Sequence, residues 1–190
     1  MPHGTFSVCV YCGARDGARP AFARAADSVG TMLAENGLRL VYGAGDVGLM
    51  GRVARAAQAG GGATLGVIPA HLMAREIGKR DLDALIVTET MHERKKVMFM
   101  NADAIVVLPG GAGTLDEVFE VLTWRQLGLH EKPVFFLDID GYWSPLLDLL
   151  KHIVAEGFAG ADLLRMYSIA SSVDALADAL SFITAARSAG

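Results

Sequence analysis

Short apolar runs alternate with longer amphipathic patterns along the whole chain. The short runs are nearly continuous in hydrophobic and β-branched residues, as strands covered on both faces of a sheet are. They cover residues 6–11, 38–42, 64–68, 84–88, 104–108, 134–138 and, with a weaker pattern, 167–170. Helical patterns lie between them, at residues 21–36, 48–59, 92–101, 115–127, 144–156 and 173–186. The strict alternation predicts an α/β fold with a doubly wound parallel sheet and helices on both faces.

The size and composition of the chain are those of one domain. Its 190 residues are 52% hydrophobic and 20% charged, and the sequence shows no repeat, low-complexity tract or linker. Residues 1–190 are therefore predicted to form a single domain, with a Ser/Ala/Gly tail that frays after about residue 186.

The net charge and the hydropathy pattern indicate which binding partners and which cellular compartment to expect. The formal net charge is −4, so no general basic field favours nucleic acid or an anionic membrane. No apolar run reaches the roughly 18–20 residues that span a bilayer, and no signal-peptide pattern begins the sequence, so we expect a cytoplasmic protein. Cys9 and Cys12 form a C-x-x-C inside an apolar run, which favours buried small residues over a redox pair or a metal site.

A first glycine loop follows the second predicted strand. Residues 43–48 read G-A-G-D-V-G, which satisfies G-x-G-x-x-G between a strand and a helix. A dinucleotide fold also needs an acidic residue at the end of the next strand, to hold the ribose. That strand ends in G-V-I-P, and the first acid after it is Glu76, so the NAD interpretation loses its second requirement. The loop either holds a phosphate or only permits close packing of strand and helix.

A second glycine loop follows the fifth predicted strand and is the stronger signal. It consists of Pro109, Gly110, Gly111, Ala112, Gly113 and Thr114. Glycines let backbone N–H groups converge on an oxyanion, and the positive end of the helix dipole lies where the next helix begins. No Gly-Lys-Ser/Thr follows, so the loop favours a monophosphate over ATP.

The spacing T-x-x-E occurs at two predicted helix starts. Thr114 and Glu117 fit a capping box, or Glu117 is a functional carboxylate beside a bound ligand. Thr90 and Glu93 repeat the spacing, and Arg94-Lys95-Lys96 follows directly. Cations in a first helical turn oppose the helix dipole, so an anionic ligand nearby would explain them, with solvated surface charge as the alternative.

Together these segments resemble the LOG family, the cytokinin riboside 5′-monophosphate phosphoribohydrolases that are often misnamed lysine decarboxylases. The family's P-G-G-x-G-T-x-x-E spans residues 109–117, and its M-x-x-R-K spans residues 91–95. Further matches are G-L-M-G at 48–51, R-E-I at 75–77, T-W-R-Q-L-G at 123–128, K-P-V at 132–134 and D-G-Y at 140–142. The resemblance therefore extends over nearly the whole chain.

The resemblance implies a Rossmann-like fold and hydrolysis of the N-glycosidic bond in adenosine 5′-monophosphates, N6-substituted or plain, to the free base and ribose 5-phosphate. Arg94 and Glu117 match the family's catalytic pair. The substrate-contacting positions that it implies are Gly13, Gly45, Glu76, Met91, Lys95, Pro109, Gly110, Gly111, Ala112, Gly113, Thr114 and Thr123. It also implies a homodimer with sites near the subunit interface, no metal and no other cofactor. The apolar stretch 118–122 is a candidate interface.

Two other functions compete with this hypothesis. A non-catalytic carrier of a nucleotide or a molybdopterin-type cofactor would use the same loops, but it has no need of a paired Arg94 and Glu117. An NAD-dependent oxidoreductase would need the ribose acid that this chain lacks.

Overall fold

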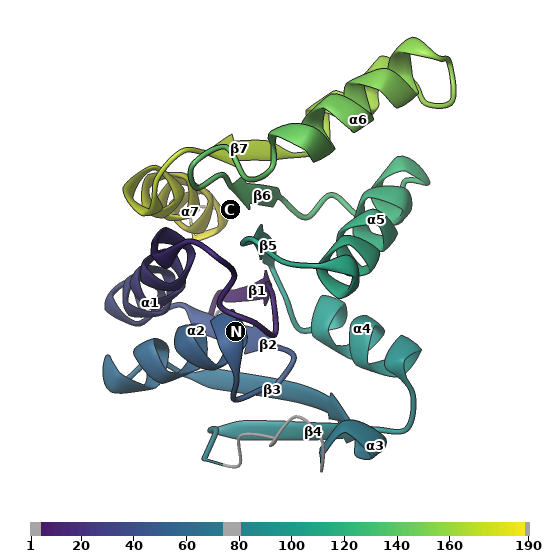
Figure 1. Ribbon diagram of the computed structural model, residues 1–190. Helices are drawn as coiled ribbons and strands as arrows, with labels where there is room; N and C mark the ends of the chain where they lie inside the picture. The colour runs from purple at the N-terminus through teal and green to yellow at the C-terminus, as the bar shows by residue number, and fades with distance from the viewer. Residues whose placement is uncertain (1–4, 74–80, 189–190) are drawn as a thin grey trace.

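Seven parallel strands form one sheet in the order β4-β3-β2-β1-β5-β6-β7 in the computed structural model, which describes residues 5–73 and 81–188 (Figure 1). The strands are β1 Ser7–Tyr11, β2 Arg39–Tyr42, β3 Thr64–Pro69, β4 Ala84–Thr88, β5 Ala104–Val107, β6 Val134–Leu137 and β7 Ser168–Ala170. The helices are α1 Pro20–Glu35, α2 Gly48–Ala59, α3 Ala70–Met73, α4 Met91–Met100, α5 Ala112–Gln126, α6 Ser144–Ala155, the 3₁₀ helix η1 Ala161–Arg165 and α7 Val173–Ser188.

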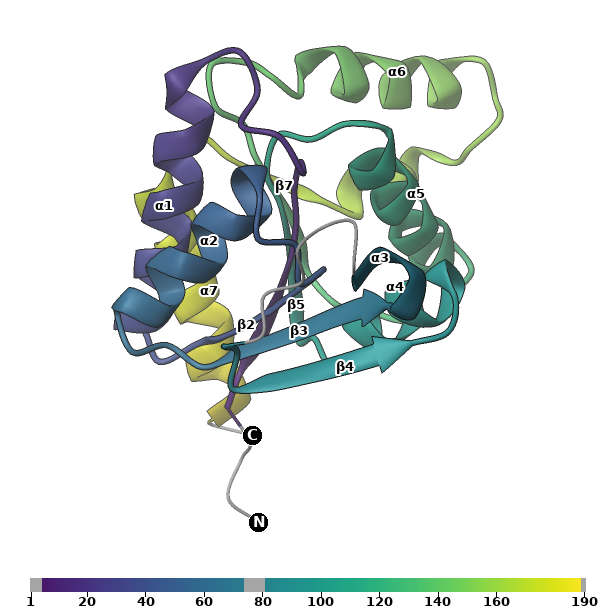
Figure 2. The same ribbon diagram turned by 60° about the horizontal axis from the view of Figure 1, so that its bottom comes forward.

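Helices cover both faces of the sheet. One hydrophobic core lies between the sheet and α1, α2 and α7, and a second lies between the sheet and α4, α5 and α6 (Figure 2). Along β1, Val8 and Val10 belong to the first core, whereas Cys9 and Tyr11 belong to the second. Because successive strand residues point to opposite faces, both cores draw on the same short strand. This explains why the strand patterns are nearly continuous in hydrophobic residues.

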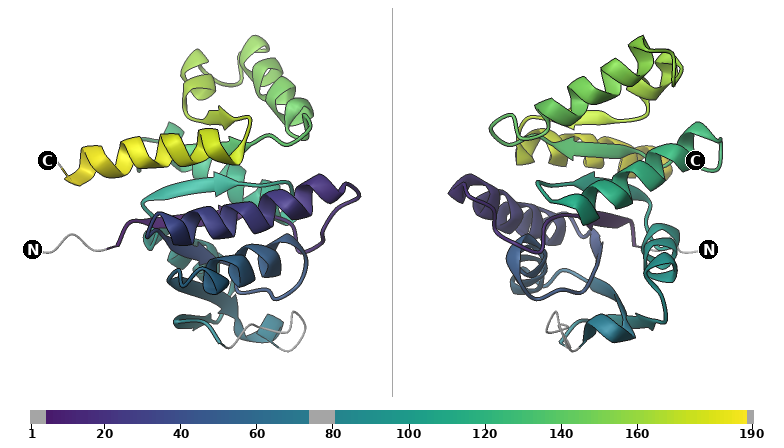
Figure 3. Two further views of the ribbon diagram at one scale, coloured as in Figure 1. Left: turned by 90° about the vertical axis from the view of Figure 1, so that its left-hand side faces the viewer. Right: turned by 45° about the vertical axis from the view of Figure 1, so that its right-hand side comes forward.

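The strand order places a topological switch point between β1 and β5. From β1 the sheet grows through β2, β3 and β4 in one direction, and from β5 it grows through β6 and β7 in the other. The loops that leave the carboxyl ends of these two strands diverge to opposite faces, and a crevice forms between them. The start of β1 and the end of α7 lie together at the opposite edge, where Arg187 pairs with Asp103 at 2.6 Å (Figure 3).

The predicted fold class is confirmed, since all seven strands, the six predicted helices and the single α/β domain are present. Two short elements, α3 and η1, were not predicted, and α7 continues to Ser188. In the candidate interface at 118–122, Val118, Val121 and Leu122 are buried in the core beneath α5, so only Phe119 and Glu120 could contact a partner, and the interface stays a prediction. Within the described ranges, no helix has the length and apolar character needed to cross a bilayer.

One helix start differs from the prediction in a way that affects the site. We expected a helix from residue 115, with Thr114 just before it, but α5 begins at Ala112 and Gly111 is its N-cap. Thr114 therefore lies inside the first turn, and no side chain caps this helix. The capping-box interpretation of Thr114 and Glu117 is wrong.

Candidate active site

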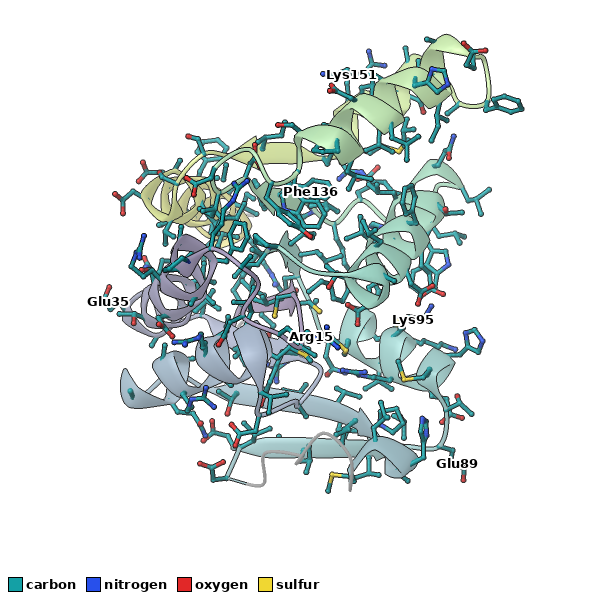
Figure 4. All side chains as sticks on the ribbon, in the orientation of Figure 1. Arg15, Glu35, Glu89, Lys95, Phe136 and Lys151 are labelled. Atoms are coloured by element: carbon teal, nitrogen blue, oxygen red, sulfur yellow. The ribbon has the colours of Figure 1, made fainter. Side chains whose placement is uncertain are left out.

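A cavity of about 720 Å³ lies at the carboxyl edge of the sheet, around the switch point. Its walls come from the loop after β1, the starts of α1 and α2, α3, the start of α4, the second glycine loop with the start of α5, and the loop after β6. The lining residues are Cys12, Gly13, Ala14, Arg15, Asp16, Gly17, Ala18, Arg19, Phe22, Leu49, Met50, Leu72, Met91, Arg94, Pro109, Gly110, Gly111, Gly113, Thr114, Asp116, Glu117 and Tyr142. Figure 4 shows Arg15 near the middle of the molecule, in the space between α2 and α4. The cavity has the size of a small-ligand site.

The second glycine loop forms the part of this cavity that suits an anion. Gly111 caps α5 without a side chain, so the backbone N–H groups of the first turn are not covered by a capping group. They stand at the positive end of the helix dipole, where anions bind. A Cβ on Gly110 would overlap the side chain of Thr114, lying 2.6 Å from its Cβ, so glycine lets the loop fold tightly onto the helix start.

Two contacts hold this loop in place. The Tyr142 hydroxyl donates to the Gly110 carbonyl oxygen at 2.5 Å, and the Gly13 N–H donates to the Pro109 carbonyl oxygen at 3.0 Å. The Gly13 carbonyl oxygen in turn accepts from the Met50 N–H at 3.3 Å. The segment after β1 therefore connects the second glycine loop to the start of α2.

Glu117 lines the cavity from the second turn of α5. Burial raises the pKa of this carboxyl to about 7, the Arg94 charge opposes the rise, and Asp116 adds to it. A carboxyl group that titrates near neutrality can both accept and release a proton under physiological conditions, which is the property required of an acid–base catalyst.

Arg94 lines the same cavity from α4 and is buried. Its Nη2 donates to the Gly43 carbonyl oxygen at 2.9 Å, and Nη1 lies 3.8 Å from the Met91 sulfur. Among the described residues Nε has no hydrogen-bond partner, and no carboxylate forms an ion pair with this guanidinium. A buried cation with no ion pair to any carboxylate in the described part of the chain is well suited to receive an anionic ligand.

Lys95, the next residue, does not line the cavity. Its Nζ pairs with Asp116 at 3.0 Å and with Glu120 at 3.3 Å, so it links α4 to α5 (Figure 4). Burial lowers the pKa of Lys95, but its bonds to these two carboxylates outweigh that effect, so the net shift is upward. The link holds together the two helices that carry Arg94 and Glu117.

The structure brings most of the predicted site residues to one place. Those that line the cavity are Gly13, Met91, Arg94, Pro109, Gly110, Gly111, Gly113, Thr114 and Glu117. Those that do not line it are Gly45, Lys95, Ala112 and Thr123, of which Thr123 is exposed farther along α5. Glu76 lies outside the described residues. No cluster of three or more His, Cys, Asp or Glu residues able to hold a metal occurs within residues 5–73 and 81–188.

Sequence reasoning missed the residues that come from the loop after β1 and from α1, above all Arg15, Arg19 and Phe22. It also gave Tyr142 no role at the site, although D-G-Y was part of the family pattern. The missing signal was topological: the loop after the first strand borders the switch point, and ligands bind there. Strand order, which only the structure shows, identifies this loop.

The fold and the cavity first define a class of protein: a Rossmann-like α/β protein with a small-ligand cavity at the switch point of its sheet. Solved structures share this fold. The molybdenum cofactor binding protein from Rippkaea orientalis superposes with a TM-score of 0.74 at 24% identity, covering 96% of this chain and 99% of that one. The molybdenum cofactor carrier protein from Chlamydomonas reinhardtii gives a TM-score of 0.70 at 21% identity over 95% and 99% of the two chains.

Sequence comparison then identifies the family. A family model described as "Possible lysine decarboxylase" matches residues 50–180. The cytokinin riboside 5′-monophosphate phosphoribohydrolase LOG7 of Arabidopsis thaliana is 48% identical over 151 residues, 80% of this chain and 70% of the relative. The phosphoribohydrolase LOG of Oryza sativa subsp. japonica is 45% identical over 159 residues, 84% of this chain and 66% of the relative. The chain belongs to this family, the LOG family.

Proposed function

We propose that this protein is a phosphoribohydrolase that cleaves the N-glycosidic bond of adenosine 5′-monophosphates, N6-substituted or plain. The products are the free base and ribose 5-phosphate. One observation carries the proposal: Arg94 and Glu117 line the same cavity as the glycine loop at the start of α5. An anion site, a buried cation and a carboxyl group with a pKa near 7 together meet the needs of this reaction.

The reaction breaks the bond between the base nitrogen and the anomeric carbon, and water supplies the oxygen that replaces the base. Positive charge develops on the ribose as this bond breaks, as it does in glycoside hydrolysis. The Glu117 carboxylate stabilises that charge and accepts a proton from the attacking water. The departing base takes up a proton, so the charge balances. Water is the only co-reactant, and no cofactor is part of the proposal.

The remaining groups bind and orient the substrate. The N–H groups at the start of α5 and the Thr114 hydroxyl bind the 5′-phosphate, and Arg94 holds the phosphate or the ribose in line. Binding the remote phosphate positions the bond that reacts. Apolar side chains on other walls, from Phe22, Leu49 and Met50, give the base a suitable surface. We also propose that the protein is a homodimer, as the family resemblance implies, and that it acts in the cytoplasm, as expected from the sequence.

The decisive experiment incubates the purified protein with AMP and with N6-isopentenyl-AMP and separates the products chromatographically. We expect free base and ribose 5-phosphate in equal amounts from at least one substrate. Binding of both nucleotides without release of base would identify a carrier instead. Sedimentation of the same preparation tests the dimer.

A further inference from the structure

The first glycine loop, residues 43–48, has the sequence and position of a phosphate loop but does not line the cavity that the described residues form. It connects β2 to α2 at the carboxyl edge of the sheet, next to the site. A Cβ on Gly48, whose φ is +59°, would overlap the backbone of Ala14 and Arg15, so this glycine permits a close approach of two loops. The role of the loop therefore has to be found in its contacts with the protein.

Gly43 contacts the Arg94 side chain in two ways. Its carbonyl oxygen accepts the hydrogen bond from Nη2, and its missing side chain leaves the space that the guanidinium occupies. A Cβ at this position would overlap Nη2 and lie 2.9 Å from Cζ and 3.3 Å from Nε. Gly43 is not among the positive-φ glycines, so its backbone would accept alanine and only the Arg94 contact requires glycine.

Few other groups among the described residues hold the Arg94 guanidinium in position. Within residues 5–73 and 81–188, its other polar contact is the weak one to the Met91 sulfur, Nε is buried without a hydrogen-bond partner, and the Glu117 carboxyl interacts with it electrostatically without forming an ion pair. Thioether sulfur is a poor acceptor. The carbonyl oxygen and the open space at Gly43 therefore help to determine where this cation lies in the cavity wall.

We propose that Gly43 is a positioning residue that seats the Arg94 guanidinium, so that the first glycine loop serves the reaction through Arg94 and not by binding phosphate. The inference rests on the proposed function for the part that Arg94 plays in turnover. The contact between Gly43 and the Arg94 guanidinium is a property of the folded protein and can be tested separately.

The test is a double-substitution cycle on the full chain with Gly43→Ala, Arg94→Lys and both together. In the otherwise unchanged protein, the added methyl group of Gly43→Ala overpacks the space that the Arg94 guanidinium occupies. The substitution should therefore lower the Tm by about 3–10 °C. Lysine has no Nη2, so Gly43→Ala should change the Tm little in the Arg94→Lys background. Equal losses of Tm in both backgrounds, or no loss in either, would show that Gly43 does not act through Arg94.

The same proteins are then compared by kcat/KM for nucleotide hydrolysis. A displacement of the guanidinium by about 1 Å should lower kcat/KM by about 100-fold in the Arg94 protein and by much less in the Arg94→Lys background. Gly60→Ala is the matched control, because its Cβ would lie 2.7 Å from the Ala34 Cβ, away from the cavity. It should lower the Tm and leave kcat/KM unchanged.

The Tm cycle and the kcat/KM comparison test the Gly43–Arg94 contact and the proposed function separately. If the unsubstituted protein releases no base, the proposed function fails, whereas the Tm cycle still decides whether Gly43 seats Arg94. If Gly43→Ala lowers kcat/KM by the same factor in both backgrounds, the positioning role is wrong even where hydrolysis is observed.

Discussion

Two helix starts in this protein carry the same spacing, T-x-x-E, with opposite results. At α4, the Thr90 side chain accepts from the Glu93 N–H at 3.2 Å, and Glu93 Oε2 accepts from the Thr90 and Glu89 N–H groups at 3.2 and 2.8 Å. This is a complete capping box on an exposed helix end. At α5 the helix begins before Thr114, and Glu117 lines the cavity instead.

The difference comes from the glycine loop that precedes α5. Gly111 occupies the N-cap position without offering a side-chain acceptor, and the helix then starts at Ala112. Thr114 and Glu117 both lie past the cap, so neither can bond to it. The N–H groups at this start lack the carboxylate that closes the α4 start. Because no side chain caps α5, the N–H groups of its first turn and the Glu117 carboxyl both remain available at the cavity.

The largest expected effect comes from exchanging the two glutamates for glutamine, one at a time. Glu117→Gln should lower kcat by about 10³-fold, since glutamine can neither accept a proton nor balance the charge on the ribose. Glu93→Gln should leave kcat unchanged, because glutamine still closes a capping box. Steady-state hydrolysis of AMP or N6-isopentenyl-AMP measures both.

Thermal unfolding supplies the control for this pair. Below about pH 5, where the Glu117 carboxyl is protonated and as neutral as glutamine, both variants should keep a Tm close to that of the unsubstituted protein. A folded Glu117→Gln protein with nearly normal turnover would show that this carboxylate is not catalytic, whatever its place in the cavity.

The pH dependence of activity should reflect the pKa of Glu117 near 7, which burial raises. With the carboxylate as the active form, kcat/KM should rise with pH through about 7 and fall about tenfold per pH unit well below it. Measuring kcat/KM as a function of pH tests this expected rise. A profile that is flat between pH 5 and 8 would contradict the assignment.

Stability should respond to the same titration with the opposite sign. The folded protein holds the Glu117 proton more tightly than the unfolded chain does, because the pKa is raised, so stability falls as pH rises from about 4.5 to about 7. Glu117→Gln should remove this decline. The charged groups that act on Glu117 are Arg94 and Lys95 on α4 and Asp116 and Glu120 on α5. Cys12, in the loop after β1, stays neutral over this pH range because burial raises the pKa of its thiol.

The sequence was sufficient for the fold because each strand is buried on both faces, and continuous apolar runs are visible without tertiary information. Arg94, Glu117 and most of the second glycine loop, which the sequence singled out, do line one cavity, whereas their roles stay predictions. The sequence could not show where the Lys95 side chain lies, because the sequence pattern is the same whether the lysine contacts a ligand or pairs with Asp116 and Glu120. Nor could it show that α5 starts at Ala112, because helix starts after glycine are poorly marked.

The two threonines extend the comparison to smaller effects. Thr114→Val keeps the shape of a buried side chain that lines the cavity and removes only its hydroxyl. Loss of one hydrogen bond to a charged phosphate should raise KM by about tenfold or more, with little change in Tm. Initial-rate kinetics measure the change. An unaltered KM would mean that the backbone N–H groups bind the phosphate without the hydroxyl.

The smallest effect is expected at Thr90, and it concerns stability alone. Thr90→Val removes the acceptor of the Glu93 N–H in the α4 capping box, so it should lower the free energy of unfolding by about 1 kcal/mol and the Tm by about 2–4 °C. KM should not change, because Thr90 does not line the cavity. Denaturant unfolding of the two valine variants side by side is the measurement. If Thr114→Val cost as much stability as Thr90→Val, Thr114 would be acting as a cap after all, and the contrast between the two helix starts would not hold.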